Sequence, residues 1–191
     1  GGSEEMLNRL IAMDANKNRQ ILERCKLSLP PEKIRLIKLG LNLARHPATH
    51  ASPCARNFVM VARGIPEKGW EYAIQAVLQV NQRLNDQQHP PIMMHLYGDH
   101  SAYMTELKSR PSSKDPAILF HDYVDDVVDE IAQYDVGILP TYFISESMPY
   151  SVIEYLASGL PAVVTDIGEC ASMLDDGLGQ RAGCLVPFDS E

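Results

Sequence analysis

Short apolar runs alternate with amphipathic segments from residue 57 to the end of the chain. The runs that we interpret as strands are NFVMVAR, PIMMHLYG, AILFHDYV, DVGILPT, PAVVTDIG and AGCLVPF. Their near-continuous apolar character is typical of strands buried on both faces of a parallel sheet. The segments between them predict helices: WEYAIQAVLQVNQRLN, SAYMTELKSR, VVDEIAQ, YSVIEYLASG and CASMLDD. The pattern therefore predicts an α/β fold with a doubly wound parallel sheet.

The predicted helix WEYAIQAVLQVNQRLN is expected to bury one side against that sheet. Its apolar side is assigned to Tyr72, Ile74, Val77, Leu78 and Val80.

The first 56 residues begin with a charged stretch in which apolar positions recur near the helical period, and we predict a helix from about Glu4 to Cys25. A short strand, Ile34–Gly40, and a proline-containing loop follow. Gly1–Ser3 look like the remnant of an expression tag. We interpret residues 1–56 as this remnant with an interdomain helix, a connecting strand and a loop, and residues 57–191 as one domain.

Composition narrows the classes of partner. A net charge of -8 argues against a nucleic-acid partner, because no basic stripe could replace the counterions of phosphates. The four cysteines are scattered without a C-x-x-C pair, so neither zinc nor a disulfide framework is expected. No signal peptide is recognised and no apolar run reaches the roughly 18 residues of a membrane span, so a cytoplasmic protein is expected. An anionic ligand would need a local cationic pocket.

Two cations lie where the first strand of the domain should end. Arg63 and Lys68 share the loop ARGIPEKG, in which Gly64 and Gly69 allow the backbone to bend and approach a ligand. A planar guanidinium and a compact ammonium could together hold a diphosphate. The alternative is a pair of solvated surface cations in a turn.

The segment SESMPYSVIEYLASG predicts a helix start that could bind an anion. Pro149 suits a first helical turn, which leaves Tyr150 and Ser151 with free backbone amides at the amino end. Glu146 precedes this helix and Glu154 falls one turn inside it. Two acids beside a phosphate site are compatible with it only if they accept hydrogen bonds from hydroxyls, which indicates a nucleotide sugar. The alternative is one helix-terminal acid and one exposed acid.

The remaining strand ends carry weaker signals. Asp99 in YGDH is a candidate cap of the following helix. The loop FHDYVDD offers His121, Asp122, Asp125 and Asp126, but the last two lie where acids at a helix amino end are expected. We therefore assign no metal site.

Five motifs in order resemble those of retaining GT-B glycosyltransferases of the glycosyltransferase group 1 (GT4) type. ARGIPEKG resembles their G-R-L-x-x-x-K-G signature, YGDH their G-D-G turn and FHDYVDD their F-x-G-x-V segment. ESMPYSVIEYLASGLPAVVTDIG resembles their E-x7-E block, and GCLVPF their G-x-L-V-P strand. The resemblance extends from Asn57 to Phe188 and implies the Rossmann-like, carboxy-terminal half of a GT-B fold, which binds the donor.

The resemblance implies a role for several of these residues. Arg63 and Lys68 would hold the donor diphosphate, and Tyr150 and Ser151 would present backbone amides to it. With Glu146, the two cations form the implied catalytic set. Because such enzymes are metal-independent, no metal and no cofactor beyond the nucleoside diphosphate sugar is implied.

Three further contacts with the donor are implied. Glu154 would bind the ribose, Glu146 would contact the donor sugar, and the loop at Tyr123 would meet the base. Asp122 replaces a common glycine of the family pattern, and Tyr150 stands where a smaller apolar residue is usual. These departures leave the identity of the donor open.

The implied activity is transfer of a sugar from a nucleoside diphosphate sugar to an acceptor hydroxyl, with bacterial polysaccharide or lipopolysaccharide synthesis as one setting. The acceptor, a glycan or lipid-linked glycan, would bind an amino-terminal domain absent from this sequence. The fragment alone is then expected to be inactive, and attachment to the inner face of a membrane is left open. Rival readings are a GT-B nucleotide-sugar epimerase, a catalytically silent GT-B scaffold subunit, and a phospho-receiver or flavodoxin-like module.

Overall fold

The computed structural model describes residues 54–175 and 178–188. The chain divides into two units, residues 1–40 and 41–191, and all described residues belong to the second. The predicted helix Glu4–Cys25 and the predicted strand Ile34–Gly40 lie outside the described residues.

The described residues form one six-stranded sheet with the order β3-β2-β1-β4-β5-β6, and every neighbouring pair is parallel. The strands are β1 (Asn57–Val61), β2 (Met93–Tyr97), β3 (Ile118–His121), β4 (Val136–Leu139), β5 (Ala162–Thr165) and β6 (Gly183–Val186). Each lies within a predicted apolar run, so the predicted doubly wound parallel sheet is confirmed.

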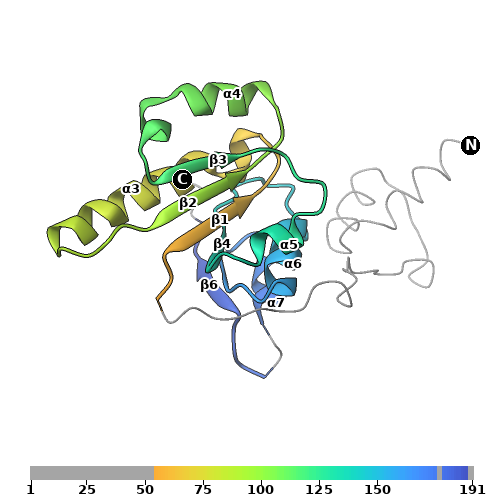
Figure 1. Cartoon of the computed structure of the whole chain (residues 1–191). Coiled ribbons are helices and arrows are strands. Elements are labelled where there is room, and N and C mark those ends of the chain that lie inside the picture. Colours follow the sequence, from red (N-terminus) through yellow and green to blue (C-terminus); the bar gives the residue numbers. More distant parts are fainter. Residues whose placement is uncertain (1–53, 176–177, 189–191) are drawn as a thin grey trace, which may run out of the picture. The chain divides into compact units, whose positions relative to one another are not determined.

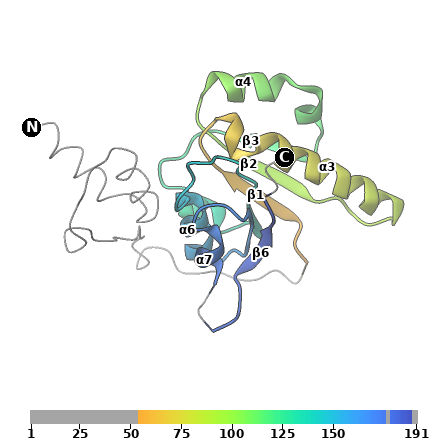
Figure 2. The same ribbon diagram turned by 180° about the vertical axis from the view of Figure 1, so that it is seen from behind.

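Helices connect the strands at the predicted places. They are α3 (Trp70–Asp86), α4 (Ala102–Ser109), α5 (Val128–Ile131), α6 (Tyr150–Ala157) and α7 (Cys170–Leu174). Figures 1 and 2 show α3 and α4 on one face of the sheet and α5, α6 and α7 on the other. Two short 3-10 helices, η3 (Pro66–Lys68) and η4 (Pro111–Lys114), were not predicted.

The buried side of α3 differs in part from the predicted side. Tyr72 is 64% exposed and Val80 39% exposed, whereas the buried positions are Trp70, Ala73, Ile74 and Val77. The side of α3 that faces the sheet also includes a polar residue, Asn81, which an apolar pattern could not identify. Asn81 exchanges two hydrogen bonds with the backbone of Ile92, at 2.8 and 2.9 Å, and so ties the end of α3 to the chain entering β2.

The side chain of Tyr155 lies where β1 and β4 separate and takes the place of a strand-to-strand hydrogen bond. The ladder of these strands pairs only Phe58 with Val136 and Val59 with Gly137, so the backbone N–H of Val61 has no partner in β4. Tyr155 of α6 is fully buried and accepts this N–H at 2.7 Å. The order of the strands reverses between β1 and β4, and such switch points are where open α/β sheets bind ligands.

Candidate functional site

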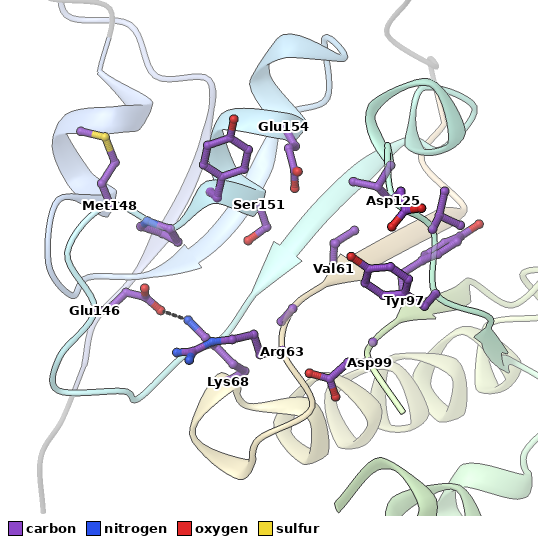
Figure 3. Close-up of a pocket in the computed structure, with 17 residues that line it drawn as sticks. Val61, Arg63, Lys68, Tyr97, Asp99, Asp125, Glu146, Met148, Ser151 and Glu154 are labelled. Carbon is purple, nitrogen blue, oxygen red and sulfur yellow. Dashed lines mark hydrogen bonds and ion pairs between the residues drawn. The ribbon is translucent and has the colours of Figure 1, made fainter. Parts of the chain in front are cut away.

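A cleft of about 400 Å³ lies at the carboxyl ends of β1, β2, β3 and β4 (Figure 3). The structure brings every site residue predicted from sequence to its lining: Arg63, Lys68, Tyr123, Glu146, Tyr150, Ser151 and Glu154. These side chains come from four different strand-to-helix loops or helix starts. Their convergence follows from the parallel topology, because all carboxyl ends meet at one edge of the sheet.

Lys68 and Glu146 form a buried ion pair at one end of this cleft (Figure 3). Their side chains are only 9% and 8% exposed. The hydroxyl of Thr141 lies 3.2 Å from the same carboxylate oxygen and 3.1 Å from the Glu67 carbonyl, so it can donate to either acceptor. The carboxylate is therefore held by a cation and a hydroxyl, and its Oε1 atom takes no part in these bonds.

The loop that carries Glu146 is fixed by backbone packing against two glycines. A Cβ atom at Gly69, where φ is +83°, would lie 1.9 Å from the carbonyl oxygen of Pro140. A Cβ atom at Gly168, where φ is +60°, would lie 2.5 Å from the carbonyl oxygen of Glu146. Both positions combine a left-handed backbone with no room for a side chain, so glycine is required at each.

An aromatic ring faces both cations. The Arg63 guanidinium lies 5.6 Å and the Lys68 ammonium 5.4 Å from the centroid of Phe143. Within the loop, the Phe143 N–H donates to the Thr141 hydroxyl at 3.2 Å, and the Phe143 carbonyl accepts the Glu146 N–H at 2.7 Å. Arg63 is exposed and lines the cleft, so its guanidinium can also reach an anion there.

Helix α6 points its amino end into the cleft. Pro149 is the N-cap, with φ of -65°, and Tyr150 and Ser151 are the first two helical residues. The first bond within the helix is donated by Val152 to the Pro149 carbonyl at 3.1 Å. The Ser151 amide thus belongs to the set that a helix end leaves for external acceptors, and the helix dipole favours an anion there.

Glu154 lines the cleft one turn further along α6. Burial raises the pKa of its carboxyl to about 7, and the nearby Asp126 carboxylate adds to this rise. A carboxyl with such a pKa is poised between its neutral and charged forms near neutral pH. Hydrogen bonds from ligand hydroxyls would favour the charged form.

The far end of the cleft is formed by the ends of β2 and β3. Tyr97 lines it and shares a 2.7 Å hydrogen bond between hydroxyls with Tyr134. Tyr123, in the loop after β3, is 58% exposed and offers its ring at the rim. This end therefore presents aromatic faces, whereas the end at Lys68 presents cationic side chains.

Several residues of the site were not predicted. Asp99 does not cap α4: that helix is capped by Ser101, whose hydroxyl accepts the Met104 N–H at 3.1 Å. Asp99 instead lines the cleft, and its Oδ1 atom is buried without a hydrogen-bond partner among the described residues. The position of Asp99 at the end of a predicted strand could have indicated that it belongs to the site. Phe143 gave no such signal, since its role depends on the three-dimensional course of the loop.

Within residues 54–175 and 178–188, no group of three or more His, Cys, Asp or Glu side chains is arranged to hold a metal ion. None of the helices in the same residues is both long and apolar enough to cross a membrane.

The family assignment follows from a match over most of the chain. The family described as "Glycosyl transferases group 1" matches residues 55–191. The chain belongs to this family. No match is found among curated proteins.

Solved structures with the same fold are glycosyltransferases. The pneumococcal O-GlcNAc transferase GtfA, in complex with UDP and GlcNAc, is 20% identical with a TM-score of 0.65, over 94% of this chain and 34% of that chain. Anabaena Alr3699/HepE, in complex with UDP-glucose, is 16% identical with a TM-score of 0.68, over 92% and 49%. WaaG, a glycosyltransferase involved in lipopolysaccharide biosynthesis, is 14% identical with a TM-score of 0.68, over 92% and 48%.

This glycosyl transferases group 1 chain therefore spans between about a third and a half of the length of these three proteins. Their shared fold is the GT-B fold, and the described residues form its Rossmann-like carboxy-terminal half. At these identities the likeness concerns the fold.

Proposed function

We propose that this domain binds the nucleoside diphosphate sugar of a retaining glycosyltransferase of the GT4 type. The observation that supports this most directly is the convergence of two cations, a helix amino end and two carboxyls in one cleft at the switch point. Arg63 and Lys68 neutralise the diphosphate, and the amides of Tyr150 and Ser151 donate to its oxygens. This arrangement needs no metal, since cationic side chains and the helix dipole stabilise the departing diphosphate.

The two carboxyls hold the sugars on either side of the diphosphate. Glu154 accepts hydrogen bonds from the ribose hydroxyls, and Glu146 accepts them from the donor sugar through its Oε1 atom. The ring of Tyr123 packs on the base. The spacing of these groups along the cleft supports this order, because Glu146 pairs with Lys68 at one end, and Asp125, two residues after Tyr123, lies at the other (Figure 3).

Transfer proceeds on the face from which the leaving group departs. The bond between the sugar C1 and the β-phosphate oxygen breaks, a bond from C1 to the acceptor oxygen forms, and the acceptor proton passes to a phosphate oxygen. Arg63 and Lys68 offset the charge that develops on the diphosphate, so they act chiefly on kcat. Retention of configuration at C1 in the product, measured by NMR on the full-length protein, tests this step; an inverted product would contradict it.

The acceptor, a glycan or lipid-linked glycan, is proposed to bind an amino-terminal domain, and the fragment alone is proposed to be inactive. The setting proposed is polysaccharide or lipopolysaccharide synthesis in the cytoplasm, with the full-length protein at the inner face of the membrane. In that protein, Lys68→Ala or Glu146→Ala should abolish transfer. Near-normal kcat in either variant would contradict the role assigned to it.

Donor binding is tested by isothermal titration of this chain with UDP, GDP and ADP. Arg63→Ala should weaken binding of whichever nucleotide binds, and Arg83→Ala on the exposed surface of α3 is a control of equal charge change. Weakening by both variants equally would indicate a general charge effect and not a diphosphate site. Absence of binding by all three nucleotides at millimolar concentration would support a silent scaffold.

A further inference from the structure

The end of the cleft away from Lys68 has a distinct chemical character. Apart from Arg63, Lys68 and residues of the segment 146–154, the cleft is lined by Val61, Ala62, Tyr97, Gly98, Asp99, Tyr123, Val124, Asp125 and Val127. Among these side chains the polar groups are two carboxylates and two tyrosine hydroxyls. None is an amide, a cation or an aliphatic hydroxyl, so the side chains that line this end offer mainly hydrogen-bond acceptors.

The direction of a nucleotide in the cleft is set by charge, given the proposed function. The diphosphate lies between Arg63, Lys68 and the amino end of α6, which places the ribose at Glu154. The base must then continue toward Tyr97 and Asp125. Figure 3 shows these two residues across the cleft from Glu146 and Lys68.

The two carboxylates at this end have different surroundings. The buried Oδ1 atom of Asp99 lies against Gly64, 2.4 Å from where a Cβ atom of that glycine would be, so it faces the protein and not the cleft. Asp125 is exposed and lines the cleft. Within the described residues, no ion-pair partner neutralises it. Asp125 is therefore the more exposed of the two carboxylates that line the cleft here.

The hydroxyl of Tyr97 is already engaged. It lies 2.7 Å from the Tyr134 hydroxyl and 3.2 Å from a carboxylate oxygen of Glu130. Its ring stacks on that of His121, with centroids 4.5 Å apart. Tyr97 thus supplies a fixed wall, and the polar recognition at this end falls to Asp125.

We propose that this site selects a guanine nucleotide, with the Asp125 carboxylate accepting hydrogen bonds from N1–H and the N2 amino group of the base. Guanine carries these two donors side by side on one edge, which matches the two oxygens of a carboxylate. Uracil offers one N–H between two carbonyl oxygens, and those oxygens repel a carboxylate. Adenine places an acceptor, N1, beside its amino group. The donor is accordingly a GDP-sugar.

The test is isothermal titration of the chain with GDP, UDP, ADP and xanthosine diphosphate. The wild-type protein should prefer GDP over UDP and ADP by roughly 5- to 150-fold, the discrimination expected of a bidentate contact to a base. Asp125→Asn replaces one acceptor by a donor, which suits xanthine, whose O2 is an acceptor beside N1–H. This variant should lose affinity for GDP and gain affinity for xanthosine diphosphate by similar factors.

Asp122→Asn is the matched control, because Asp122 is exposed in the same loop and does not line the cleft. It should leave the ratio of GDP to xanthosine diphosphate affinity unchanged. Preference of the wild-type protein for UDP or ADP, or an unchanged ratio in Asp125→Asn, would overturn the guanine assignment while leaving the proposed donor site intact. Absence of binding by every nucleotide would overturn both.

Discussion

Lys68 and Glu146, which are 78 positions apart in the sequence, form an ion pair that is almost completely removed from solvent. The pair joins η3, at the end of β1, to the loop after β4, so it crosses the switch point of the sheet. A buried pair of this kind is costly to break, because removing one partner leaves an uncompensated charge. The same two residues therefore hold two walls of the cleft together and also line it.

The contribution of this ion pair to the stability of the fold can be measured without a ligand. Lys68→Met should lower the free energy of unfolding by about 3–5 kcal/mol, since Glu146 is left buried without its cation. The double variant Lys68→Met/Glu146→Leu should recover most of that loss, because apolar groups of similar size need no partner. Urea unfolding measures both. A double variant no more stable than Lys68→Met would show that the pair contributes through more than its charges.

Phe143 is expected to position both cations for the diphosphate. Phe143→Leu keeps an apolar side chain but removes the aromatic face over which Arg63 and Lys68 lie, at about 0.5–1 kcal/mol for each cation. Nucleotide affinity should fall by roughly 5- to 30-fold, while Phe143→Tyr should bind as the wild type does. Titration of the preferred nucleotide measures the effect. Equal affinities in the leucine and tyrosine variants would show that only the volume of the side chain matters.

Much of the fold could be predicted from the sequence, because near-continuous apolar strands separated by helices allow few other arrangements. Each strand from residue 57 on was located by this pattern. The buried side of α3 was predicted only in part. Asn81 belongs to that side, but an apolar pattern cannot reveal a polar residue that bonds to the backbone of Ile92. Periodicity identified the helix but not all of the residues on its buried side.

The site was predictable to a similar degree. Residues at strand ends, such as Arg63 and Lys68, were found because the carboxyl ends of parallel strands meet at one edge. The ion pair between Lys68 and Glu146 was not predicted. Lys68 was assigned to the diphosphate, whereas it pairs with Glu146 in the structure. A contact between residues far apart in sequence has no local signal. For the same reason no sequence pattern indicated that Phe143 faces both cations.

Glu154 should make stability depend on pH. Its carboxyl has a pKa of about 7 in the folded protein against 4.5 for the unperturbed group, so the folded state binds this proton more tightly. The resulting stabilisation is complete below about pH 4.5 and is lost as the pH rises through 7. Glu154→Gln should therefore gain about 1–2 kcal/mol relative to the wild type between pH 5 and pH 8, a value reduced for partial exposure. Urea unfolding at the two pH values measures it.

The same carboxyl should link nucleotide binding to pH. If ribose hydroxyls donate to ionised Glu154, affinity rises with pH through about 7 and binding releases a proton. Titration in buffers of different ionisation enthalpy measures that proton. The nucleotide phosphate also titrates, so Glu154→Gln is the control that retains only the phosphate contribution. An identical proton release by both proteins would exclude Glu154 from the ribose site.

Tyr155 should stabilise the opening of the sheet between β1 and β4. Its hydroxyl accepts the Val61 N–H at 2.7 Å and donates to the Ile138 carbonyl at 3.2 Å, which satisfies one group from each strand. Tyr155→Phe removes the partner of both part-buried groups and should cost about 1–3 kcal/mol. Tyr103→Phe is the matched control, because that hydroxyl bonds to the exposed Glu71 at 3.5 Å and to no other side chain within the described residues. This substitution should change stability by less than about 0.5 kcal/mol.

Thermal or urea unfolding of the two variants decides the point. A loss of stability confined to Tyr155→Phe would assign the tyrosine hydroxyl to the support of the switch point. A loss of equal size in both variants would contradict that role, since the two substitutions remove the same atom. Because Val61 lines the cleft, Tyr155→Phe should also weaken nucleotide binding, whereas Tyr103→Phe should leave it unchanged.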